Sequence, residues 1–176
     1  MDRANQLADA LKTETDRGRA CVGDALLDEL FKELFRKRLV GSKAEVKDVL
    51  GVGQLLGDHG GRLKLANLLG WIGPETYSEC RTIHKIRNRM AHSLDADSFN
   101  HSAVRDLVDG LKSPRHLTIH TGGESKRVNL KRREDRFLIA VQMCILRCWW
   151  FIDHGDKLEP AADPPIDRLP KPGENK

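Results

Sequence analysis

Three residues that together could cleave RNA lie within one short segment of the chain, at Arg87, Asn88 and His92. A guanidinium can neutralise phosphate, an imidazole titrates near neutral pH and can move a proton, and an amide can orient either group or a substrate. The spacing Arg-Asn-x-x-x-His therefore predicts either a small nuclease site or an ordinary polar edge of a helix.

The segment that carries these residues is predicted to be a helix from Tyr77 to Leu94. Its apolar stripe comprises Ile83, Ile86, Met90 and Leu94, and a polar stripe beside it comprises His84, Asn88 and His92. Arg87 falls at the edge of the apolar stripe, where a permanently charged group needs an anionic partner. A purely structural interpretation is that Arg87 pairs with Asp24 or Asp28 of a neighbouring helix and that His92 only ends its helix.

Most of the remaining chain is also predicted to be helical. Apolar residues at three- and four-residue steps predict a long helix ending near Leu39, then helices over 63–69, 104–111 and 133–153, with a short one over 3–13. Ser42 and Glu45 have capping-box spacing for a helix over 43–50. Leu117–Thr121 and Val128–Leu130 predict the two strands of a small β-hairpin that turns at Gly122 and Gly123. We expect an all-α helical bundle over residues 1–154 and a Pro-rich, disordered tail over 155–176.

The composition favours a soluble, helix-rich protein, because 39% of the 176 residues are hydrophobic, 32% are charged and only 5% are aromatic. The net charge of +4 permits an anionic partner without demanding one. The apolar run Phe137 to Ile152 is shorter than the roughly 20 residues that cross a bilayer, so we expect a buried helix and no membrane partner.

Four cysteines lie mostly in apolar helical patterns, and the N-terminus has no signal-peptide pattern, which predicts reduced thiols and a cytoplasmic location. Cys144 and Cys148 share a helix face but have no companion pair at zinc spacing, and His116 and His120 do not supply one. We therefore predict neither a metal nor a cofactor.

Positive charge is concentrated between the predicted hairpin and the last helix. The candidate nucleic-acid contacts there are Lys126, Arg127, Lys131, Arg132 and Arg133. The alternative is a solvated surface that Glu124, Glu134 and Asp135 partly neutralise. No pair of short helices with a tight turn offers a recognition helix, so sequence-specific DNA readout is not expected.

Several segments, in order, resemble the mannitol operon repressor (MltR) family of bacterial helical proteins. The resemblance covers about residues 10–150, and its segments are Thr15-Asp16-Arg17-Gly18, Ala25-Leu26-Leu27-Asp28-Glu29-Leu30, Gly61-Arg62-Leu63-Lys64-Leu65-Ala66 with Leu69-Gly70, and Ile86-Arg87-Asn88-Arg89-Met90-Ala91-His92-Ser93. It implies an all-helical, often dimeric domain that regulates transcription, here without a helix-turn-helix and through a regulatory protein or RNA as partner.

The last of these segments also looks like the signature of the wider HEPN superfamily, whose active members are metal-independent ribonucleases. Carried over by residue, the resemblance implies that His92 is the general acid or base, that Arg87 stabilises phosphorane charge and that Asn88 orients the reacting groups. Five helical residues leave Arg87 and His92 about 140° apart, so a catalytic site needs either a helix that ends near Ala91 or two protomers. The regulatory hypothesis and the alternative of an endoribonuclease or toxin that uses these three residues both stay open on the sequence.

Overall fold

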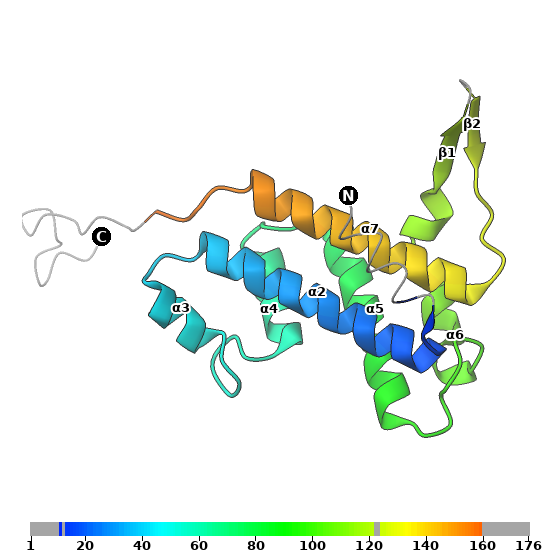
Figure 1. Cartoon of the computed structure of the whole chain (residues 1–176), viewed down its shortest axis with the longest axis horizontal. Coiled ribbons are helices and arrows are strands. Elements are labelled where there is room, and N and C mark those ends of the chain that lie inside the picture. The colour runs from blue at the N-terminus through cyan, green and yellow to red at the C-terminus, as the bar shows by residue number, and fades with distance from the viewer. Residues whose placement is uncertain (1–10, 12, 122–123, 160–176) are drawn as a thin grey trace, which may run out of the picture.

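The computed structural model describes residue 11, residues 13–121 and residues 124–159, with no side-chain description for 116 and 119–127. It is an all-α bundle with one appended hairpin (Figure 1). The elements in chain order are α2 (Asp16–Arg38), α3 (Lys43–Val49), α4 (His59–Leu68), α5 (Pro74–His92), α6 (Ser102–Asp109), the 3-10 turn η1 (Ser113–His116), β1 (Thr118–Thr121), β2 (Glu124–Arg127) and α7 (Arg133–His154).

Most of the predicted helices and the hairpin are present. The capping box that begins α3 has both of its hydrogen bonds, since Ser42 Oγ accepts from the Glu45 amide and Glu45 accepts from the Ser42 amide. β1 and β2 pair in antiparallel fashion, with Thr118 opposite Arg127, so the second strand lies at 124–127 and the prediction of 128–130 is wrong. The predicted tail beyond residue 159 and most of the predicted helix over 3–13 lie outside the described residues.

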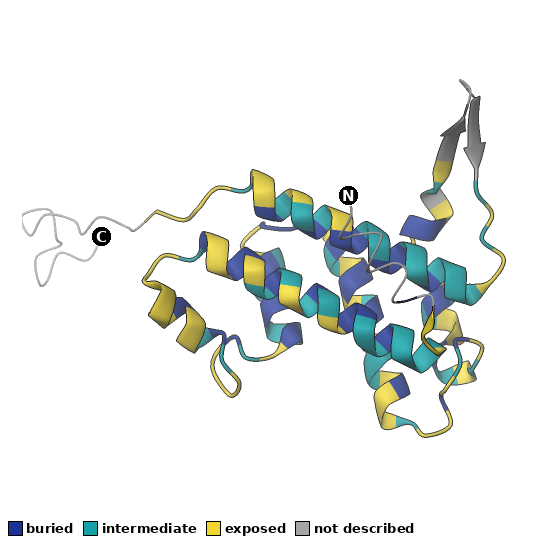
Figure 2. Ribbon diagram, in the orientation of Figure 1, coloured by how far each residue is buried: buried dark blue, intermediate teal, exposed yellow. Residues whose placement is uncertain are grey.

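The two long helices α2 and α7 lie side by side, and α5 packs against both of them (Figure 1). Their shared core is built from large apolar side chains, among them Phe31, Phe35, Ile83, Ile86, Met90, Phe137 and Val141. α4 and α6 also pack against α5, while α3 buries only Val46 and is exposed over most of its surface (Figure 2). The bundle is therefore organised around α5, which contacts four of the other helices.

α7 is the one described helix that is long and apolar enough to cross a membrane by length and composition. Seven of its residues are buried against the rest of the protein: Phe137, Ala140, Val141, Cys144, Ile145, Cys148 and Ile152. These residues recur at three- and four-residue steps, which is the pattern of a helix with one face in a core. α7 is a core helix in this fold, as the sequence predicts.

Two details of the predicted helices are wrong. Leu94 was expected to continue the buried stripe of α5, but the helix ends at His92 and Leu94 is 90% exposed. The long helix begins earlier than its apolar pattern indicates, at Asp16, because the Thr15 hydroxyl caps it by accepting from the Gly18 amide. A cap of one hydrogen bond determines this start, and apolar periodicity does not report it.

Candidate functional site

The three residues of the Arg-Asn-x-x-x-His motif lie along one continuous helix. Arg87 and Asn88 are partly buried on α5, and Arg87 donates a hydrogen bond of 2.8 Å to Asn88 Oδ1. His92 is exposed and is the last residue of the helix. Because α5 is unbroken from Arg87 to His92, the two side chains leave the helix about 140° apart, and one protomer does not bring them into a single site.

Arg87 lies beside Asp24, one of the two carboxylates predicted as its partner. Its Nε atom lies 3.8 Å from Asp24 Oδ2, and its side chain is 40% exposed. Asp28, the other carboxylate considered, instead accepts from Arg62 on α4, with Nε at 3.1 Å. Arg62 is 1% exposed and also donates to the Leu56 carbonyl, so it is a deeply buried arginine. Arg87 lies at the edge of the core, as the sequence pattern predicts, and Asp28 is taken by Arg62.

Asp24 stands at the centre of a polar cluster that three helices enclose. His59 from α4 places Nδ1 at 3.1 Å from Asp24 Oδ1, and His84 from α5 places Nδ1 at 3.0 Å from Asp24 Oδ2. The side chains of Asp24 and His59 are 7% and 6% exposed, and that of His84 is 25% exposed. The two imidazole rings meet edge to face, with their centroids 4.8 Å apart.

A chain of hydrogen bonds links Arg87 to Asp24 and determines the tautomer of His84. Because Arg87 donates to Asn88 Oδ1, the amide nitrogen of Asn88 faces His84 Nε2, at 3.0 Å. That ring nitrogen must accept, so the ring proton lies on Nδ1 and is donated to Asp24. The His84 ring thus lies between an amide donor and a carboxylate acceptor.

The two histidines also change the acidity of Asp24. Burial alone would raise the pKa of this carboxyl, but the two imidazoles beside it, His59 at an ion-pair distance and His84 through a hydrogen bond, outweigh burial and lower the pKa to about 2. Asp24 is therefore a carboxylate at neutral pH. One carboxylate and two imidazoles, with ligand atoms all within 4.8 Å of one another, are also a donor set that could hold a metal ion.

The predicted basic segment is largely paired with acidic groups where its side chains are described. Arg133 donates to Asp109 Oδ2 at 2.7 Å and to Asn100 Oδ1 at 2.8 Å, and Arg132 pairs with Glu134 at 3.3 Å. Lys131 is exposed. Lys126 and Arg127 belong to β2, but their side chains lie outside the described part of the chain. Arg133 thus joins α7 to α6, and its charge is only partly available to a ligand.

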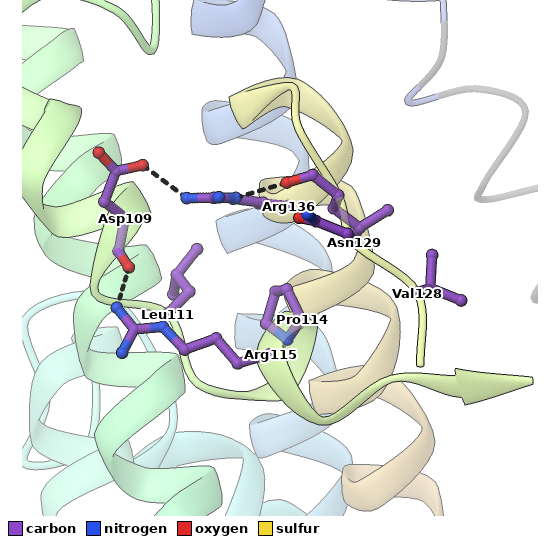
Figure 3. A pocket seen from close by; sticks show the side chains of 8 residues that line it. Asp109, Leu111, Pro114, Arg115, Val128, Asn129 and Arg136 are labelled. Carbon is purple, nitrogen blue, oxygen red and sulfur yellow. Dashed lines mark hydrogen bonds and ion pairs between the residues drawn. The ribbon is translucent and has the colours of Figure 1, made fainter. Parts of the chain in front are cut away.

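A pocket of about 390 Å³ opens beside this segment, at the base of the hairpin. Figure 3 shows Asp109 on one wall, with Arg136 reaching across to its carboxylate and Arg115 directed at its backbone carbonyl. Arg136 also donates to the Leu130 carbonyl at 2.8 Å. The guanidinium groups of this pocket thus bind Asp109 and backbone oxygens.

The four cysteines are free thiols, as expected, and Cys80, Cys144 and Cys148 are buried. Interactions of the Cys80 thiol with the Cys144 and Cys148 thiols, together with burial, raise the pKa of Cys80 well above its ordinary value. Protonated, enclosed thiols do not ionise readily and are poor nucleophiles. These cysteines act as core residues.

Sequence reasoning did not find the Asp24, His59 and His84 cluster. These residues come from three helices, and their separations of 35 and 25 positions match no metal or catalytic spacing. A signal was present in the placement of Asp24, because Ala20, Leu27 and Phe31 lie four residues before, three after and seven after it, on the buried side of the long helix. The spacing of the cysteines, His116 and His120 predicts no metal site, and it carries no information on these three residues.

The protein is an all-α bundle in which two long helices pack on a central one and enclose a polar cluster. No family model and no curated protein match the sequence. Among solved structures, a chain in the X-ray structure of the MtlR–HPr complex from Escherichia coli matches with a TM-score of 0.57 and 20% identity, over 87% of this chain and 98% of that chain. The MltR-like helical fold expected from the sequence is therefore confirmed.

Proposed function

We propose that this chain is a bacterial regulatory protein of the MltR kind that acts by binding a small protein partner of the HPr class. The observation that carries the proposal is the likeness of its fold to the MtlR–HPr complex, which extends over 98% of the matched chain. That protein is solved with HPr, and here the same kind of partner is proposed. Because the sequence predicts no helix-turn-helix, its effect on transcription would pass through such a complex.

An exposed apolar pair on α7 supports a protein partner. Leu146 and Trp150 are 50% and 57% exposed, and they lie four residues apart on the same face of the helix. Trp150 stacks on the ring of His154, with centroids 4.9 Å apart, which presents a broad flat surface. Tryptophan is enriched among the residues that dominate protein–protein affinity. We propose that this pair contributes to the docking surface.

The proposal is tested by titrating the purified protein with HPr from Escherichia coli and from the source organism, using calorimetry. We expect a saturable complex that Trp150→Ala weakens by about tenfold or more, the loss of an interface anchor. Leu55→Ala, at an apolar residue that is 80% exposed and lies after α3, is the matched control and should bind like the wild type. If no HPr binds, the proposed partner class is wrong. If deleting the gene leaves all transcript levels unchanged, the proposed regulatory role is wrong.

A metal-independent endoribonuclease is the second candidate, and the partly exposed Arg87 beside Asn88 favours it. In this proposal two cytoplasmic protomers form a homodimer that brings Arg87 of one motif near His92 of the other, with Lys126, Arg127, Lys131, Arg132 and Arg133 as RNA contacts. RNA incubated with wild type in EDTA should be cleaved, His92→Ala should be inactive, and His154→Ala should cleave normally. Equal cleavage by wild type and His92→Ala would exclude this enzyme.

A further inference from the structure

We propose that Asp24, His59 and His84 bind one divalent transition-metal ion of the zinc class. The three residues bring a carboxylate and two imidazoles to one point between α2, α4 and α5. Imidazole and carboxylate ligands suit zinc and the related first-row ions, and three protein ligands leave a coordination position for water or another group. The site is independent of the partner-binding function proposed above.

The spacing of the ligand atoms fits such an ion. The carboxylate oxygens of Asp24 lie 3.1 Å from His59 Nδ1 and 3.0 Å from His84 Nδ1. A tetrahedral ion with bonds of about 2.0–2.1 Å has ligands about 3.3 Å apart. Because the three ligand atoms lie within 4.8 Å of one another, the ligands must move closer by up to about 1.5 Å to complete the coordination.

His59 supplies the observation that points to a ligand. Its side chain is 6% exposed, and neither ring nitrogen has a hydrogen-bond partner within the described chain. Nδ1 is close to Asp24 Oδ1, but the approach lacks the direction of a hydrogen bond, so the two atoms share an ion-pair distance only. Buried polar atoms are nearly always partnered. A metal ion between this nitrogen and the carboxylate would satisfy both.

Asn88 is suited to support the bound state. Coordination through Nδ1 of His84 moves the ring proton to Nε2, which must then donate. A turn of the Asn88 amide presents Oδ1 to that proton, and this is the carbonyl-type partner that metal-bound histidines use. The same turn breaks the hydrogen bond from Arg87 to Asn88 Oδ1.

The site is most accessible to solvent on the side where His84 and Arg87 lie. Their side chains are 25% and 40% exposed. Arg87 Nε is 3.8 Å from Asp24 Oδ2, so a bound dication and this guanidinium compete for one carboxylate. Binding would therefore release Arg87 toward solvent. The metal would link three helices and also control the exposure of the arginine in the sequence motif.

The test uses tag-free, full-length protein freed of metal with a chelator and then titrated with Zn²⁺ by calorimetry at pH 7.5. We expect one ion per chain, and Co²⁺ as a spectroscopic probe should give the visible absorption of a low-symmetry nitrogen and oxygen site. His84→Gln, Asp24→Asn and His59→Gln should each weaken Zn²⁺ binding by more than about 100-fold, beyond the effect of an outer partner. Asn88→Ala should weaken it by about 10–100-fold.

His154→Gln is the matched control, because His154 is an exposed histidine on α7, outside the cluster. It should bind Zn²⁺ like the wild type. Zn²⁺ should raise the melting temperature of the wild type and of His154→Gln, but not that of His84→Gln. His84→Gln changes a partly exposed residue, so the proposal stays testable if the buried variants fail to fold. Absence of one-to-one binding by the wild type, or unchanged binding by His84→Gln, would overturn the proposal.

Discussion

The guanidinium of Arg17, in the first turn of α2, donates hydrogen bonds to the backbone oxygens of Ser93 at 2.9 Å and Leu94 at 2.8 Å. It therefore holds the chain at the point where it leaves α5, directly after His92. The neighbouring Asp16 accepts from the Phe99 amide at 2.9 Å. Two residues of the Thr15–Gly18 segment thus hold the start of the connection from α5 to α6, which gives this part of the family resemblance a structural role.

Replacing Arg17 with alanine should lower the free energy of unfolding by about 1.5–3 kcal/mol, because two backbone carbonyls directly after α5 lose a charged donor. Urea denaturation followed by circular dichroism measures this loss. Arg36→Ala, at an exposed position on the same helix, is the control and should change the free energy of unfolding by less than about 0.5 kcal/mol. Equal effects of the two substitutions would show that the Arg17 hydrogen bonds contribute little.

The ion pair between Arg62 and Asp28 should show strong coupling. Asp28→Leu leaves a guanidinium that is 1% exposed without its carboxylate, and it should lower the free energy of unfolding by about 3–5 kcal/mol. The double variant Asp28→Leu with Arg62→Met removes both charges and should lose less than the two single variants combined. A double-mutant cycle in urea measures the coupling, and strictly additive losses would contradict the prediction.

Acid should destabilise the protein partly through Asp24. Its folded pKa of about 2 lies below the ordinary 3.8, so the carboxylate contributes stability above about pH 4 and loses that contribution as the pH falls toward 2. The contribution is on the order of 2 kcal/mol. In chelator, Asp24→Asn should therefore show a flatter fall in the free energy of unfolding between pH 5 and pH 2 than wild type. The exposed control Asp48→Asn should follow the wild-type slope.

Thiol reactivity should separate Cys21 from the other three cysteines. Cys80, Cys144 and Cys148 are buried and the pKa of Cys80 is raised, whereas Cys21 is partly exposed. Iodoacetamide at pH 8 should therefore label Cys21 first in the native protein and all four thiols in urea. Mass spectrometry of the labelled peptides gives the order. Rapid native labelling of Cys80 would contradict the packing described here.

Local patterns were sufficient to predict most of the fold. The three-residue spacing of Ser42 and Glu45 predicts the start of α3, and apolar periodicity predicts that Ile83, Ile86 and Met90 are buried on α5. Both signals depend on residues within a few turns of one helix. Where the chain leaves its helix the signal stops, and for that reason Leu94 was assigned to the core although it is exposed.

The polar interior could not be predicted in the same way, because its partners come from different helices. Asp24 was considered only as a partner for Arg87, although its nearest groups are His59 and His84. Predicting whether Asp24 or Asp28 pairs with Arg87 requires the position of Arg62, because Arg62 forms an ion pair with Asp28. Such choices depend on how helices pack, and a single sequence does not report packing angles.

The carboxylates of α2 also determine how this helix is aligned with its neighbours. Asp16 binds the connection after α5, Asp24 meets two histidines, and Asp28 meets Arg62. A slide of α2 by one turn, about 5.4 Å, would separate all three from their partners at once. Apolar ridges alone can repack one turn further along a groove, but three fixed charges cannot do so together. These contacts fix α2 in a single register against its neighbours. A movement of α2 that keeps all three contacts must rotate or tilt the helix without sliding it.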